Sequence, residues 1–248
     1  MGVWGKVLGG VGGFAFGGPL GAIMGAVAGH AYDKMKESGS PDDLQDIRQN
    51  AARQTAFTTA IIVLSAKMAK ADGEVSRQEV DAFKTLFNIP PNEMKAVGTL
   101  FDRAKQETDG FEPYAEQIAT MFAAQPEVLE ELIGALMHIA MADGHFHPEE
   151  RKFLRKVSLI FGFSEDAHER VTNIHAGEEG PDPYEVLGVT PDVSDAELKK
   201  AYREQVRLNH PDRLISHGLP QEFVDLANEK MSAINGAYDQ LEKSRGLK

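Results

Sequence analysis

A stretch without charged side chains at the start of the chain constrains the fold more than any other feature. Between Lys6 and Asp33 lie 26 residues with neither an acid nor a base apart from His30. As one helix this stretch would be about 39 Å long, and a bilayer core needs about 20 residues. The stretch therefore predicts a membrane anchor over residues 1–35, ahead of the part of the chain that folds in water.

Glycines recur at every fourth position of this stretch. They are Gly5, Gly9, Gly13, Gly17, Gly21, Gly25 and Gly29. A spacing of four places them on one slowly drifting stripe of a helix. Because glycine has no Cβ, a second helix can approach the stripe closely, and in lipid such close packing favours association. We therefore expect a homodimer formed through the middle of the stripe. The residues expected at this contact are Gly13, Gly17, Gly21 and Gly25.

Three other interpretations of the stretch remain open. It could be a cleaved signal peptide, with Lys6 as its basic start and Ala26-Val27-Ala28 as the cleavage site. It could also be a membrane hairpin that turns at Gly17-Gly18-Pro19. The third possibility is a disordered tail. The uncharged run is longer and richer in glycine than a signal peptide requires, which favours a retained anchor. Lys34 and Lys36 follow the stretch. This excess of positive charge indicates a single pass through the bacterial inner membrane, with the later domains in the cytoplasm.

The middle of the chain has the pattern of a helical bundle. After a polar connector at 36–50, apolar residues between 51 and 175 recur at the i, i+3, i+4 spacing of helices, without convincing strand alternation. One such face is formed by Phe57, Ala60, Ile61, Leu64 and Met68, and another by Val128, Leu129, Leu132, Ala135, Leu136 and Ile139. The fold class expected for the whole chain is therefore all-α.

This bundle contains an internal repeat. Residues 68–75 (MAKADGEV) match residues 139–146 (IAMADGHF), and each copy follows an apolar helix and precedes an acidic helix start. After the first copy, Ser76 and Glu79 form a capping box, and after the second, Pro148 suits the first turn of a helix. The alanine-Asp-Gly pattern and its acidic continuation resemble the TerB-like domain of tellurite-resistance proteins.

The resemblance implies a helical domain linked to metal or stress sensing, so the acids near the two turns are candidate oxygen ligands. They are Asp72, Glu74, Glu79, Asp143, Glu149 and Glu150, with His145 or His147 nearby. We favour a structural explanation, because Asp-Gly makes a tight turn and acids at a helix start interact favourably with its dipole. An EF-hand at Asp72 is excluded, since its twelfth position is Phe83 rather than glutamate. Neither a metal site nor a cofactor is therefore expected.

The C-terminal segment, residues 182–248, follows a short linker at 176–181 and predicts two long helices. The first begins at Ser194 or Asp195, with a capping box to Glu197, and ends at His210-Pro211-Asp212 because a residue before proline disfavours helix. One face carries Lys199, Arg203 and Arg207 four apart, with Lys200 adjacent. The second helix carries Phe223, Leu226, Ala227, Met231, Ile234, Ala237, Tyr238 and Leu241. We expect the two helices to bury their apolar faces on each other.

These motifs, in this order, resemble a J domain. They are Tyr184-x-x-Leu187-Gly188, Leu198-Lys199-Lys200-Ala201-Tyr202-Arg203, His210-Pro211-Asp212 and Ile234-x-x-Ala237-Tyr238-x-x-Leu241. The resemblance implies that a DnaK-type chaperone binds this segment, and that the segment stimulates the partner's ATPase without being an enzyme. The residues implied in chaperone binding are His210, Pro211, Asp212, Lys199, Lys200, Arg203 and Arg207. With its glycine-rich start and TerB-like middle, the chain resembles the DjlA-type membrane-anchored co-chaperones.

Some features depart from the J-domain pattern, and others argue against competing functions. Arg213 stands where many J domains have lysine, Leu214 replaces a frequent asparagine, and only seven residues follow Leu241, too few for a full fourth helix. The chain has no cysteine for a zinc module, and its net charge of −12 argues against nucleic-acid binding. The alternative function is a membrane scaffold or metal-responsive stress sensor that acts through the TerB-like bundle.

Overall fold

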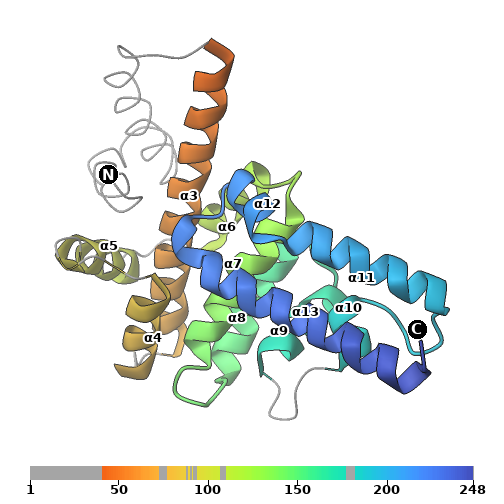
Figure 1. Ribbon diagram of the computed structural model, residues 1–248. Helices are drawn as coiled ribbons and strands as arrows, with labels where there is room; N and C mark the ends of the chain where they lie inside the picture. Colours follow the sequence, from red (N-terminus) through yellow and green to blue (C-terminus); the bar gives the residue numbers. More distant parts are fainter. Residues whose placement is uncertain are drawn as a thin grey trace.

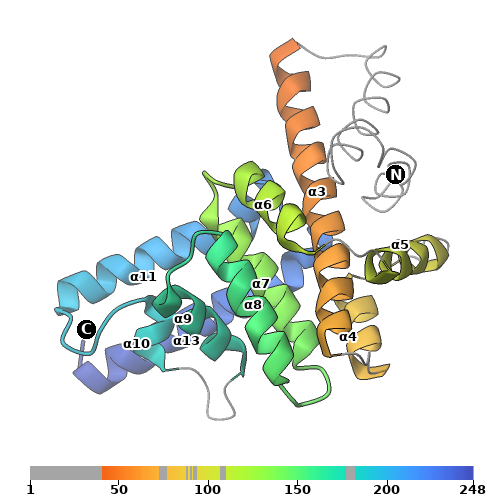
Figure 2. The ribbon, with the colours of Figure 1, turned by 180° about the vertical axis from the view of Figure 1, so that it is seen from behind.

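Every regular element of the described residues is a helix, as expected for an all-α fold (Figures 1 and 2). The computed structural model describes residues 41–72, 77–87, 94–106, 110–176 and 182–247, together with Ile89 and Pro91. The anchor expected at 1–35 lies outside these residues. Within them, no helix combines the length and the apolar character needed to cross a bilayer.

The long helix α3 (Pro41–Asp72) forms the axis of the bundle. It begins at Pro41, a residue suited to a first helical turn, so the second part of the expected connector is helical. From Ala56 to Ala69 its side chains are buried on every face, including the polar Thr58 and Ser65. The apolar face expected from the sequence is only part of what α3 buries, because other helices surround it.

The remaining helices of the bundle pack either on α3 or on α7. They are α4 (Arg77–Phe87), α5 (Met94–Gln106), α6 (Glu112–Met121), α7 (Pro126–Ala140), α8 (Pro148–Ile160) and α9 (Glu165–Ala176). Helices α5, α6, α7 and α8 contact α3, while α4 and α9 contact α7. Leu132 and Leu136 of α7 are fully buried. Helices α3 and α7 therefore form the centre of the core.

The C-terminal segment forms a second group of helices. They are α10 (Pro183–Leu187), α11 (Asp195–Asn209), α12 (Pro211–Ser216), the short 3₁₀ helix η2 (Gln221–Phe223) and α13 (Val224–Arg245). The capping box predicted for α11 is present, since the Ser194 hydroxyl accepts from the Glu197 N–H and the Glu197 carboxylate accepts from the Ser194 N–H. Helix α13 continues to Arg245, and Gly246 ends it in the left-handed region at φ 64°.

Helix α13 contributes to two different cores. Its second half packs against α10 and α11, where Leu198, Ile234 and Leu241 are buried and the Tyr202 and Tyr238 rings stack with centroids 4.1 Å apart. This half matches the expected burial of two helices on each other.

The first half of α13 instead enters the bundle. Phe223, Leu226 and Ala227 are buried in the same core as the apolar residues of α3 and α7. The Phe223 ring meets Phe57 of α3 edge to face, with centroids 4.8 Å apart. The expectation that α11 covers the whole apolar face of the last helix is therefore wrong for this half, because α3 and α7 cover it.

Candidate functional site

The tripeptide His210-Pro211-Asp212 forms the junction between two helices. Helix α11 ends at Asn209, and His210 is both its C-terminal cap and the N-terminal cap of α12. Pro211 occupies the first turn of α12, where its missing N–H costs no hydrogen bond. The His210 Nδ1 accepts from the Asp212 backbone N–H at 3.2 Å. This cap fixes the backbone, and a neutral His210 in this arrangement keeps Nε2–H as the donor available to a partner.

The side chains of the tripeptide stay accessible although its backbone is fixed. The His210 side chain is 53% exposed and the Asp212 side chain is 91% exposed, and the Asp212 carboxylate lies 4.0 Å from the His210 Nδ1. Within the described residues, no Ser, Thr or Lys nucleophile bonds to His210. The arrangement can therefore offer directional polar contacts to another protein.

The expected basic face lies along α11. Lys200, Arg203 and Arg207 are exposed and Lys199 is half-buried. Arg203 Nε donates to the Lys199 carbonyl at 3.2 Å, which orients its guanidinium along the helix. Arg207 pairs with Glu204, and this hydrogen bond raises the pKa of the Arg207 guanidinium. The face is thus basic at Lys200 and Arg203 and partly neutralised next to the tripeptide.

Both ribbon views show α11 extending outward from the bundle beside α13, while α12 lies against the bundle (Figures 1 and 2). The tripeptide therefore lies where the projecting helix meets the bundle.

Acidic residues of α7 hold the short helix α12. Glu127 is 5% exposed, and its Oε1 accepts from Arg213 Nη2 at 3.2 Å and lies 3.0 Å from His217 Nδ1. Arg213, the residue that departs from the lysine of many J domains, therefore directs its guanidinium into the bundle. The tripeptide is joined through the next residue to a buried carboxylate.

The turn after α12 passes very close to α3. Gly218 has φ 113°, and a Cβ there would lie 2.6 Å from the Cβ of Arg53 and 3.1 Å from the Phe122 ring. Only glycine fits this conformation and approach. On either side of it, the Asn50 and Gln54 side-chain amides donate to the carbonyls of Ile215 (3.3 Å) and Leu219 (3.5 Å). The backbone of this turn is thus anchored directly to α3.

A buried ion-pair network joins α13 to α7. Lys230 Nζ lies 3.1 Å from Glu130 Oε2 and 2.9 Å from Glu131 Oε1, and Arg170 of α9 lies 3.1 Å from Glu130. Burial of Lys230 opposes its charge, but the attraction of Glu131 and Glu130 outweighs this and raises its pKa. Burial of Glu130 likewise favours its neutral form, while Lys230 and Arg170 lower the pKa of its carboxyl below the usual value. Lys230 and Glu130 are therefore both charged in the folded protein.

These acids were not among the residues singled out in the sequence, although a signal is present. Glu127, Glu130 and Glu131 have i, i+3, i+4 spacing within the otherwise apolar α7. Acids on the buried face of a helix need partners, because an unpaired buried charge is strongly unfavourable. Their partners come from α9 and from the distant C-terminal segment, so the sequence indicates that cations are needed but not which residues supply them.

Two of the candidate metal ligands, Asp143 and Glu150, act as turn and cap residues. The Asp143 carboxylate accepts from the His145 N–H at 2.8 Å, and Glu150 accepts from the His147 N–H at 3.0 Å at the start of α8. Pro148 is the first residue of that helix, as predicted. The described residues contain no group of three or more His, Asp or Glu side chains placed to hold a metal ion. Glu74 lies outside the described residues.

The glycines expected at the anchor contact also lie outside the described residues. They are Gly13, Gly17, Gly21 and Gly25.

Comparison with known proteins gives three family matches that together span most of the chain. Residues 1–52 match the co-chaperone DjlA transmembrane domain, residues 58–173 match tellurite resistance protein TerB, and residues 182–246 match the DnaJ domain. The co-chaperone protein DjlA of Photobacterium profundum is 31% identical over 99% of this chain and 100% of its own length. Those of Vibrio cholerae and Coxiella burnetii are 29% and 27% identical, over 100% and 98% of both chains. No solved structure matches the chain. The three resemblances drawn from the sequence are confirmed.

Proposed function

Because the chain belongs to the DjlA family of membrane-anchored J-domain co-chaperones, we propose that it binds a DnaK-type chaperone and stimulates the ATPase of that partner. The contact is made by His210, Pro211 and Asp212 together with the basic face of α11. The observation that carries this proposal is the tripeptide itself, whose backbone is capped into place while the His210 and Asp212 side chains remain 53% and 91% exposed.

A fixed backbone with accessible polar side chains suits an allosteric contact. A ligand can shift an equilibrium between two states of a protein only by the difference in its affinity for them. The chain is such a ligand, because its contacts are stronger with the hydrolysis-competent state of the partner than with the other state. Hydrolysis takes place at the partner's own nucleotide site. We therefore assign the chain the role of a regulator without catalytic residues of its own.

The charges of α11 favour an acidic partner surface. Lys200 and Arg203 are exposed on a helix that projects from the bundle, so they steer the approach of the partner and fix its orientation. Arg207 and the half-buried Lys199 lie on the same face, and Arg207 requires its bond to Glu204 to open before it can pair with the partner. The largest electrostatic contribution is therefore expected from Lys200 and Arg203.

The anchor places this activity at a membrane. We propose that residues 1–35 cross the bacterial inner membrane once, that the described residues face the cytoplasm, and that two anchors associate through Gly13, Gly17, Gly21 and Gly25. The excess of Lys34 and Lys36 over Lys6 and the unbroken spacing of the glycines support these assignments. Nucleic acid is not an expected partner, given the net charge of −12.

The experiment that tests the proposal uses the full chain in lipid nanodiscs with a DnaK-type chaperone and ATP. We expect His210→Gln to reduce stimulation of the ATPase at least about tenfold, because one directional donor is lost at the centre of the contact. The thermal melting of the variant should stay within a few degrees of that of the parent, since the side chain is exposed and losing its cap to the Asp212 N–H costs only about 1 kcal/mol.

A matched control is His145→Gln, which changes an exposed histidine on the distant turn between α7 and α8. This variant should stimulate the partner as well as the parent does. Full stimulation by His210→Gln would contradict the proposed mechanism.

A further inference from the structure

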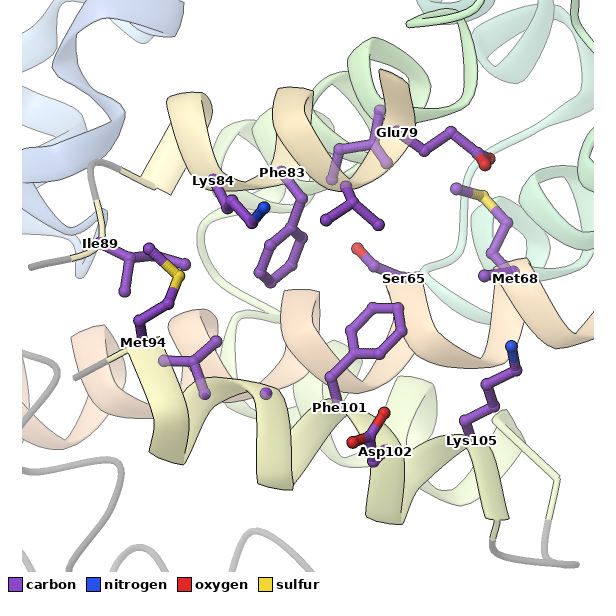
Figure 3. Close-up of a pocket in the computed structure, with 15 residues that line it drawn as sticks. Ser65, Met68, Glu79, Phe83, Lys84, Ile89, Met94, Phe101, Asp102 and Lys105 are labelled. Atoms are coloured by element: carbon purple, nitrogen blue, oxygen red, sulfur yellow. The ribbon is translucent and has the colours of Figure 1, made fainter. Parts of the chain in front are cut away.

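An apolar pocket of about 380 Å³ opens between α4 and α5 (Figure 3). Its floor is formed by Ser65 and Met68 of α3, and its walls include Phe83 of α4 and Phe101 of α5. These two rings meet edge to face with centroids 5.7 Å apart. The volume falls within the range of about 300–1,000 Å³ that holds small-molecule ligands, and none of the residues assigned to chaperone binding lines it.

The shape of the pocket limits what can enter. The lining follows α5 from Met94 to Lys105, a length of about 16 Å at 1.5 Å per residue. A volume of about 380 Å³ along this length is enough to hold a single unbranched hydrocarbon chain.

The polar groups of the pocket are few and favour a ligand with oxygen atoms. The Ser65 side chain is 2% exposed, and its hydroxyl has no hydrogen-bond partner among the described residues. Figure 3 shows it beside the Phe83 and Phe101 rings. A buried hydroxyl without a partner is unfavourable. This hydroxyl is therefore available to a polar atom of a bound molecule.

The two ends of the pocket differ in the cations that they offer. At the Ile89 end, Lys84 pairs with Asp81 at 3.2 Å. At the opposite end, Figure 3 shows the Lys105 ammonium near Met68, and the described residues give Lys105 no ion pair. Glu79 lines this end too and already has an interaction partner. Lys105 is therefore the cation best placed to receive an anion.

We propose that this pocket binds a free medium-chain fatty acid, with its carboxylate at Lys105 and its hydrocarbon chain alongside the touching rings of Phe83 and Phe101. At roughly 1.2 Å per bond of an extended chain, a twelve-carbon acid is about 14 Å long and fits within this length of about 16 Å. The flexible thioethers of Met68 and Met94 adapt to small differences in ligand shape. The site lies in the TerB-like bundle and does not depend on the proposed contact with the chaperone.

The position of the pocket along α3 favours a free acid over a bilayer lipid. The match to the transmembrane domain ends at residue 52, and Ser65 lies about 20 Å farther along the same helix. The acyl tail of a lipid would have to leave the bilayer to reach the pocket, which is opposed by the hydrophobic effect. A free carboxylate can reach it through water.

The absence of cysteine from the chain allows a test at one defined position. Gly98 lines the pocket, and a Cβ there meets nothing within 4 Å, so Gly98→Cys is sterically compatible with the fold. The rate of maleimide modification of this variant is measured in the full chain in nanodiscs, with and without dodecanoate. The matched control is Thr120→Cys, at an exposed position of α6 outside the pocket.

We expect dodecanoate to slow modification at Gly98→Cys at least fivefold, with saturation, and to leave Thr120→Cys unchanged. When Lys105→Gln is added to the Gly98→Cys variant, the dodecanoate concentration that gives half-maximal protection should rise about tenfold, because one charge-assisted contact is lost. The same change should leave protection by dodecanol unaltered. Absence of protection at Gly98→Cys, equal slowing at both positions, or protection by additional phospholipid alone would overturn the proposal.

Discussion

Two groups of cations belong to the same C-terminal segment, Lys200 and Arg203 of α11 in the first and Arg213 of α12 and Lys230 of α13 in the second, yet solvent reaches mainly the first group. Lys200 and Arg203 are exposed and project from the bundle, whereas the Lys230 side chain is 10% exposed between two carboxylates. The comparison shows that basic residues close together in sequence serve different purposes. In the first group, Lys200 and Arg203 are open to solvent, whereas Arg213 and Lys230 of the second group hold the J domain to the bundle.

This difference matters because ionic contacts have very different energies in the two settings. Exposed ion pairs contribute about 0–1 kcal/mol, whereas removing one member of a buried pair costs about 3–5 kcal/mol because it leaves an uncompensated charge. Substitutions in the two groups should therefore separate stability from chaperone stimulation.

The largest effect is expected from Lys230→Met. The change keeps most of the apolar stem and leaves Glu130 and Glu131 without their shared cation, so the free energy of unfolding should fall by about 3–5 kcal/mol. Chemical denaturation of the full chain measures it. The matched control is Lys200→Met on α11, which should change stability by less than about 0.5 kcal/mol. Similar losses for both variants would remove the distinction between the two groups.

A smaller loss is expected from Glu127→Gln. The amide retains the shape of the side chain but not the charge that Arg213 and His217 face, and charge-assisted hydrogen bonds contribute about 1.5–3 kcal/mol. Denaturation should show a loss within that range. Glu116→Gln, on the exposed side of α6, is the control and should be nearly neutral. An unchanged stability for Glu127→Gln would show that the charge of Glu127 does not hold α12.

A pH-dependent effect is expected from a buried histidine elsewhere in the bundle. Burial lowers the pKa of His168 against the opposing attraction of Glu165, and its Nδ1 lies 2.9 Å from the Ser158 hydroxyl. The unfolded chain protonates His168 more readily than the folded protein does. The contribution of His168 to the stability of the folded protein is therefore present above about pH 6.5 and is lost as the pH falls through the folded pKa. His168→Gln should flatten the decline in melting temperature between pH 7 and pH 5, as thermal scans would show. If the melting temperature of His168→Gln declined as steeply as that of the parent, the decline would have to come from other titratable groups.

The smallest effect on stability is expected from Arg203→Ala. This exposed side chain bonds only to the Lys199 carbonyl among the described residues, so the free energy of unfolding should change by less than about 0.5 kcal/mol. The partner concentration that gives half-maximal stimulation should nevertheless rise severalfold at low salt, and the difference should shrink at high salt. A rise that does not depend on salt would argue against electrostatic steering.

Much of the fold follows from local sequence signals. The helix type, the capping box at Ser194, the end of α11 before His210 and the cap at the start of α8 all depend on residues near each other in the chain. Local propensity and periodicity report such features directly. The exposed position of His210 and Asp212 also agrees with the sequence reasoning.

The contact between the J domain and the bundle could not be predicted in the same way. Phe223 and Leu226 fit the apolar face of a helix whether that face packs on α11 or on α3, because periodicity gives the face and not its neighbour. Arg213 differs little in type from the lysine of related domains, and only the fold brings Glu127 to it. Such pairings between distant segments require the three-dimensional arrangement.

The close approach of α3 to the turn after α12 has a consequence for the order of folding during synthesis. Asn50 donates to the carbonyl of Ile215, 165 residues later, and Phe57 packs on Phe223 in the same region. At about 5–20 residues per second, roughly 8–33 s separate the appearance of the two sides of this contact. During that time the part of the apolar surface around Phe57 that Phe223 covers has no partner, although the anchor that precedes it has already been made. A nascent chain interrupted before α12 would keep this surface open beside the membrane, where it can associate with other incomplete chains.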